Sequence, residues 1–73
     1  MANLKSITAR LEIRGIKPIK ADKTTIWITQ SLYIQVQPNS IVVFKNDASG
    51  MSMYECQNRI EDIVSKLKQA IGV

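Results

Sequence analysis

Apolar and polar residues alternate near the start of the chain, where residues 6–14 read Ser-Ile-Thr-Ala-Arg-Leu-Glu-Ile-Arg. A period of two residues is typical of a β-strand with one solvent-exposed face, so the pattern predicts a strand over about residues 5–14. Its apolar face would carry Ile7, Ala9, Leu11 and Ile13. Gly15 ends the pattern, and the following residues 16–24 are lysine-rich and contain Pro18, which cannot donate to a β-ladder. We expect a loop there, with room for an edge strand around residues 16–19.

The same alternation returns in residues 25–37. Apolar residues occupy the even positions apart from Gln30, and the odd positions carry Trp27, Tyr33, Gln35 and other polar residues. Because the phase never slips, one long bent strand is the preferred interpretation. Two strands that meet at a turn near residues 29–31 are the alternative, disfavoured because no Gly, Pro, Asn or Asp marks a turn there.

A turn is expected at Gln37-Pro38-Asn39-Ser40, where proline presets φ, and a return strand over residues 41–46. A two-residue loop would pair Gln37 with Ser40 and place Tyr33 opposite Phe44. A three-residue loop would slip the register by one residue and turn Val42 and Phe44 inward.

The last part of the chain carries a helical pattern. Ser52 and Glu55 have the spacing of a capping box, and Gly72 is a suitable C-terminal residue, so we expect a helix over residues 52–71. Its apolar positions recur every three or four residues, as in a helix that faces a core. They are Met53, Cys56, Ile60, Ile63, Val64, Leu67, Ala70 and Ile71.

These elements predict a single α+β domain over residues 1–73. It would be an antiparallel β-meander of three or four strands, with one C-terminal amphipathic α-helix packed on one face. The other face would carry a candidate binding surface made of Trp27, Tyr33, Gln35, Val42 and Phe44.

Composition excludes much of enzyme chemistry. The chain has 73 residues, no histidine and one cysteine, so it contains no Ser-His-Asp triad, Cys-His pair, histidine metal site or internal disulfide. Cys56 is interpreted as a small buried hydrophobe. We therefore expect no catalysis, no metal and no cofactor. Without a signal-peptide pattern or an apolar run of about 20 residues, we expect an intracellular, cytoplasmic protein that does not enter a membrane.

The net charge of +4 is concentrated in residues 1–25, which hold six basic and two acidic residues. A candidate basic patch in this region comprises Arg10, Arg14, Lys17, Lys20 and Lys23. If Arg10 and Arg14 lie on the outward face of the first strand, they share the side that bears Trp27 and Tyr33.

An uncovered aromatic face on a small domain is typical of an interface. The preferred hypothesis is protein–protein contact, with a second copy as a homodimer or with an acidic partner protein that the chain occludes, as inhibitor and accessory proteins do. The alternative is a single-stranded nucleic-acid-binding module, in which the cations contact phosphates and Trp27 and Tyr33 stack on bases.

A minor alternative concerns Ser49, Gly50 and Ser52. If they lead from a strand into a helix N-terminus, the free amides there would favour an anion or a nucleotide. The chain has no dinucleotide or P-loop glycine pattern, and Ser52 is already used as a cap, so a plain connection is preferred.

Overall fold

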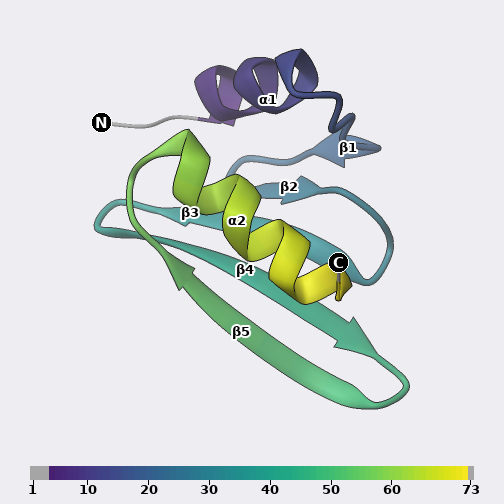
Figure 1. Cartoon of the computed structure of the whole chain (residues 1–73). Coiled ribbons are helices and arrows are strands. Elements are labelled where there is room, and N and C mark those ends of the chain that lie inside the picture. The colour runs from purple at the N-terminus through teal and green to yellow at the C-terminus, as the bar shows by residue number, and fades with distance from the viewer. Residues whose placement is uncertain (1–3, 73) are drawn as a thin grey trace.

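The computed structural model describes residues 4–72. They form a five-stranded antiparallel sheet, with one helix before the strands in the sequence and one after them. The elements run α1 (Leu4–Ile13), β1 (Lys20–Ala21), β2 (Thr25–Trp27), β3 (Leu32–Gln37), β4 (Ser40–Asp47), β5 (Gly50–Cys56) and α2 (Ile60–Ile71). The strands follow one another across the sheet in the order β1-β2-β3-β4-β5 (Figure 1). The α+β class, the meander and the C-terminal helix on the sheet are as the sequence predicts. The sheet has five strands rather than three or four, and a second helix is present.

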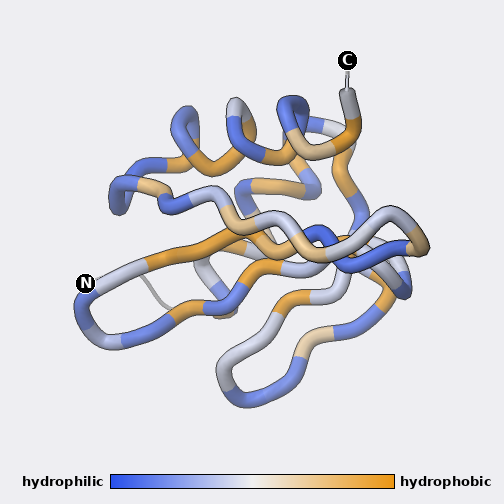
Figure 2. The backbone as a smooth tube through the Cα atoms, turned by 90° about the horizontal axis from the view of Figure 1, so that it is seen from below, coloured by the Kyte–Doolittle hydropathy of each residue, from blue (hydrophilic) through white to orange (hydrophobic). Residues whose placement is uncertain are grey.

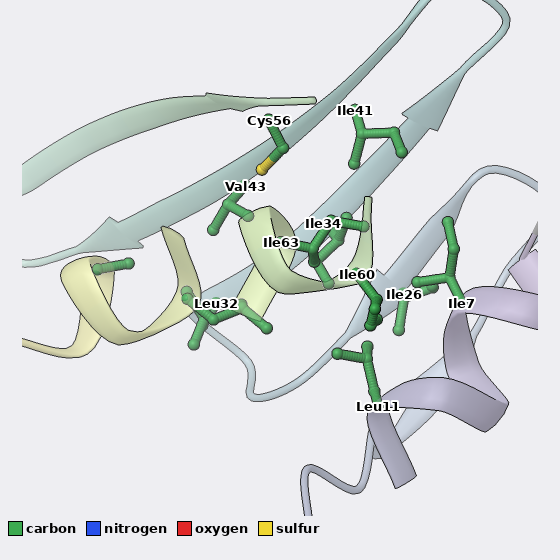
Figure 3. Close-up of a cluster of buried hydrophobic side chains, with 12 residues drawn as sticks. Ile7, Leu11, Ile26, Leu32, Ile34, Ile41, Val43, Cys56, Ile60 and Ile63 are labelled. Atoms are coloured by element: carbon green, nitrogen blue, oxygen red, sulfur yellow. The ribbon is translucent and has the colours of Figure 1, made fainter. Parts of the chain in front are cut away.

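Both helices cover the same face of the sheet. Helix α2 crosses β4 and β5, and α1 lies beside α2 over the β1–β2 end (Figure 1). The hydrophobic side of α2 faces the sheet, and its hydrophilic side faces away (Figure 2). The core between these layers is wholly apolar (Figure 3), and its members are Ile7, Leu11, Ile26, Leu32, Ile34, Ile41, Val43, Cys56, Ile60, Ile63, Leu67 and Ala70.

The prediction of a strand over residues 5–14 is wrong, because residues 4–13 form α1. Only Ile7 and Leu11, four residues apart, are buried, and Ile13 is 81% exposed. Gly15 ends this helix in a left-handed conformation, with φ of 82°. The N–H of Gly15 donates to the carbonyl of Glu12 at 3.0 Å, and that of Ile16 donates to the carbonyl of Leu11 at 2.9 Å. These two bonds make a Schellman motif, in which Ile16 packs against the same core as Leu11.

Residues 25–37 form two strands, β2 and β3, so the alternative of a turn near residues 29–31 is correct and the single bent strand is wrong. The turn is closed by threonine. The Oγ1 atom of Thr29 accepts a hydrogen bond from the N–H of Ser31 at 3.2 Å, and the N–H of Thr29 donates to the carbonyl of Leu32 at 3.0 Å. A hydroxyl that hydrogen-bonds two residues ahead replaces the missing Gly, Asn or Asp.

The β3–β4 hairpin has a two-residue loop at Pro38-Asn39, so of the two alternatives for the register the three-residue loop is wrong. Gln37 pairs with Ser40, and Tyr33 pairs with Phe44. The predicted strand over residues 41–46 is therefore confirmed within one residue at each end.

The predicted helix over residues 52–71 begins too early, because residues 50–56 form β5 and α2 begins at Ile60. Ser52 and Glu55 lie on this strand and form no capping box. The end is as predicted, since the N–H of Gly72 donates to the carbonyls of Lys68 and Gln69. The apolar stripe of α2 is also confirmed at Ile60, Ile63, Leu67 and Ala70, which are buried, whereas Met53 and Ile71 are exposed.

Candidate binding face on the outer side of the sheet

The sheet face that neither helix covers, here the outer face, carries one residue from each strand in a line. Lys20 pairs with Trp27, Trp27 with Tyr33, Tyr33 with Phe44, and Phe44 with Met53. Directly opposed residues of an antiparallel sheet share a face. The three predicted aromatic residues therefore form a continuous row, here the aromatic row (Trp27, Tyr33 and Phe44), between a cation and a methionine.

The rings of the aromatic row pack against one another, in a tilted pair and a stacked pair. The centroids of Trp27 and Tyr33 are 4.5 Å apart with 36° between the ring planes. Those of Tyr33 and Phe44 are 5.3 Å apart with 15° between the planes. The Nζ atom of Lys20 lies 5.1 Å from the centroid of Trp27. Tyr33 thus has a neighbouring ring on either side, and Trp27 lies between Lys20 and Tyr33, so that these rings are half-buried by their own neighbours.

A second line on the outer face is more polar and runs through Thr25, Gln35, Val42 and Glu55. Val42, predicted to be exposed, is only 9% exposed although no helix lies over it. Gln37 extends the polar line, and its Nε2 atom donates to Oε1 of Gln35 at 3.2 Å. The outer face therefore combines the apolar aromatic row with a more polar line of residues beside it.

Two methionines of β5 complete the outer face. Met53 is 64% exposed and Met51 is 56% exposed, so they are more exposed than any ring of the aromatic row. Sequence reasoning missed them because it placed Met53 on the buried stripe of a helix. The available signal was the run Asp47-Ala48-Ser49-Gly50, whose residues are typical of a hairpin loop between two strands.

The predicted basic patch is divided by the fold. Arg10 belongs to α1 and Arg14 directly follows it, on the side of the sheet opposite the aromatic row, so their placement on an outward strand face is wrong. Arg14 forms an ion pair of 3.6 Å with Glu61 of α2. Arg10 lines a surface pocket of about 240 Å³ between the two helices, together with Arg59.

The other predicted cations lie in or beside the connections. Lys17 and Lys23 are exposed in the segments before and after β1. Lys20 alone joins the aromatic row. With Lys20 at one end and Glu55 near the other, the outer face does not carry the charge excess of the chain.

The possible anion site at Ser49, Gly50 and Ser52 required these residues to lead into a helix N-terminus, and that requirement is not met. These residues belong to the β4–β5 hairpin and not to a helix N-terminus. Asp47 already occupies the turn, since its Oδ1 atom accepts hydrogen bonds from the N–H of Ser49 at 3.0 Å and from its Oγ atom at 2.6 Å. These bonds lower the pKa of Asp47, and the negative charge is unfavourable for an anion.

Within residues 4–72, no three His, Cys, Asp or Glu side chains are close enough to hold a metal ion. Burial raises the pKa of the Cys56 thiol to about 11. Neither described helix is long and apolar enough to cross a membrane.

Comparisons with protein-family models, with curated proteins and with solved structures found no match to this chain.

Proposed function

We propose that the chain is a small non-catalytic binding protein whose outer face contacts a partner protein. The observation that carries this proposal is the packing of the rings of the aromatic row against one another. Nucleic-acid bases stack on free ring faces. Here Tyr33 and Phe44 are stacked at a centroid distance of 5.3 Å and Trp27 is tilted against Tyr33 at 4.5 Å, so each ring already has an aromatic neighbour.

The distribution of charge supports the same choice. Single-stranded nucleic acid requires cations beside the stacking surface, because phosphate contacts supply much of the affinity. Lys20 is the one predicted cation beside the aromatic row, and it already lies over Trp27. The aromatic row, bordered by polar side chains such as Gln35, has the composition of a protein interface, with an apolar centre and a polar rim.

A site-specific crosslinking experiment tests the proposal. A photoreactive residue in place of Gln35 lies on the outer face beside the aromatic row, and one in place of Gln69 lies on the exposed side of α2. In cells that express the chain, we expect a defined protein adduct from position 35 and none from position 69. Tyr33→Ala in the position-35 chain should remove the adduct, while circular dichroism shows that the fold persists.

A titration with a single-stranded oligonucleotide, followed by Trp27 fluorescence at low and at moderate salt, tests the nucleic-acid alternative. We expect no saturable change at either salt concentration. Saturable quenching that weakens steeply with salt would show phosphate-dependent binding and would overturn the proposal. Equal adducts at positions 35 and 69 would overturn it as well.

A further inference from the structure

The two edges of the sheet are protected to very different degrees. An exposed edge strand offers unpaired N–H and C=O groups to other chains, and proteins usually protect it with short strands, proline or lysine. Edge strand β1 has two residues, follows Pro18 and carries Lys20. Edge strand β5 has seven residues, Gly-Met-Ser-Met-Tyr-Glu-Cys, with neither proline nor lysine.

The side of β5 that points away from β4 is regular and, within the described residues, is not paired with another strand. Its register with β4 runs without a bulge from the Asp47–Gly50 pair to the Ile41–Cys56 pair. No described segment pairs with its other side (Figure 1). In a two-residue hairpin the pair that flanks the loop is hydrogen-bonded, and bonded and non-bonded pairs then alternate. The N–H and C=O groups of Met51, Met53 and Glu55 therefore point away from β4.

We infer that β5 pairs with β5 of a second copy in an antiparallel, two-fold symmetric dimer centred on Met53. In this register Met53 opposes Met53 of the other copy, and Met51 opposes Glu55 in both directions. Each outward-pointing residue of one copy then meets an outward-pointing residue of the other. A register centred on Ser52 would leave Glu55 of each copy without such a counterpart.

The chemistry of β5 favours its own copy as the occupant. Glu55 is the one charged residue of the strand, and in the inferred register it lies opposite a methionine rather than opposite itself. Like charges directly opposed across a sheet are destabilising. Met53, which is 64% exposed in the single chain, gains the Met53 side chain of the other copy as a neighbour at the two-fold axis.

The dimer also changes the outer face. A two-fold axis perpendicular to the sheet keeps both outer faces on one side, and the five-stranded sheets join into one of ten strands. The line Lys20–Trp27–Tyr33–Phe44–Met53 then continues into the same line of the second copy in reverse order. The edge pairing is independent of what binds the outer face.

Charge substitutions at Met53 test the register. We expect the wild-type chain to have twice its monomer mass of 8.2 kDa in sedimentation equilibrium at micromolar concentrations. Met53→Lys and Met53→Glu each place like charges at the two-fold axis, and each should raise the dimer Kd about tenfold or more. An equimolar mixture of the two variants should restore the dimer mass.

Met51→Lys is the matched control. It adds the same charge on the same strand and face, but in the inferred register it lies opposite Glu55 of the other copy, so the dimer should persist. Association through the outer face would instead be weakened by Met51→Lys and by Tyr33→Ala. A wild-type chain that stays monomeric, or a Met51→Lys variant as monomeric as Met53→Lys, would overturn the inference. Circular dichroism of each variant confirms that the fold is retained.

Discussion

Cys56 shows how burial removes reactivity from a single side chain. Its Sγ atom lies in the core and donates a weak hydrogen bond to the carbonyl of Tyr54 at 3.6 Å. Burial, followed by the nearby charge of Asp62, raises the pKa of the thiol from 9.0 to about 11. The thiolate, which is the nucleophile, is therefore scarce at neutral pH.

We predict that Cys56 reacts slowly with iodoacetamide at pH 8 in the folded chain. The difference between the two pKa values alone lowers the thiolate fraction, and with it the rate, about a hundredfold relative to the chain in urea. The measurement is the alkylation rate by mass spectrometry, with and without urea. Similar rates in both conditions would show that the thiol is not buried.

The side chain of Asp62, in the first turn of α2, is hydrogen-bonded to the loop between β5 and α2. Its Oδ2 atom accepts a hydrogen bond from the N–H of Gln57 at 2.6 Å, and its Oδ1 atom accepts one from the Nζ atom of Lys66 at 3.1 Å. The Lys66 contact is the ordinary pairing of residues four apart on a helix. The Gln57 contact has no such sequence signature, because it depends on the path of the loop.

We predict that Asp62→Asn lowers the Tm at pH 7 and reduces the loss of stability in acid. The hydrogen bonds, that from Gln57 first, lower the pKa of Asp62 below 3.8 in the folded chain. The carboxylate therefore stabilises the fold above pH 3.8, and this contribution disappears as the pH falls through the lower, folded-state pKa. The measurement is Tm by circular dichroism from pH 7 to about pH 2.

Glu61→Gln is the control for Asp62→Asn. Glu61 is an exposed neighbour whose ion pair with Arg14 spans 3.6 Å. Exposed pairs contribute little, so its acid profile should follow the wild type. If both variants have the wild-type profile, the hydrogen bonds of Asp62 do not contribute to stability.

At the scale of elements, α1 is the clearest case of a segment with two valid patterns. Residues 7, 9, 11 and 13 fit a strand, while Leu4, Ile7 and Leu11 fit a helix. The signal that separates them is the ending, since Gly15 followed by the apolar Ile16 fits the Schellman motif.

Two substitutions distinguish the helix from the strand. Leu11 is fully buried and Ile13 is 81% exposed, although a strand would bury both on one face. We predict that Leu11→Ala lowers the free energy of unfolding by about 2–5 kcal/mol. Ile13→Ala should change it by less than about 0.5 kcal/mol. Urea denaturation followed by circular dichroism measures both, and equal losses would support the strand.

The segment over residues 50–56 is the second such case. Its Ser-x-x-Glu spacing fits a capping box, and the positions of Met53 and Cys56 extend the stripe of α2. Pairing with β4 over seven residue pairs outweighs these local signals, because it joins the strand to the sheet and places Cys56 in the core. Helical spacing from residue 60 onward was a sound guide because no strand competes for that segment.

At the scale of the whole molecule, stability is expected to fall from the middle of the sheet to the β1 edge. Strand β4 is bonded on both sides and carries Ile41, Val42 and Val43, which are buried. Strand β1 has two exposed residues and one neighbour. Segments with few buried apolar contacts open most easily.

We predict that amide hydrogen exchange is slowest in β3 and β4 and fastest, among the strands, in β1. The measurement is residue-resolved exchange by NMR. Protection of Lys20 and Ala21 equal to that of Val43 would contradict this order and show that the whole sheet opens as one unit.

Local sequence patterns were enough to predict the α+β class, the turn at Pro38-Asn39, the apolar stripe of α2 and an outward face with Trp27 and Tyr33. The place of Phe44 in the aromatic row depends on the length of the hairpin loop, for which the sequence allowed two or three residues. Packing in the folded chain selects a helix for residues 4–13 and a strand for residues 50–56. Both segments satisfy two periods at once, and the free energy of burial, as with Leu11 over Ile26 and Cys56 beside Ile41, selects between them. That selection moved Arg10 and Arg14 away from the aromatic row and brought Met53 into line with it.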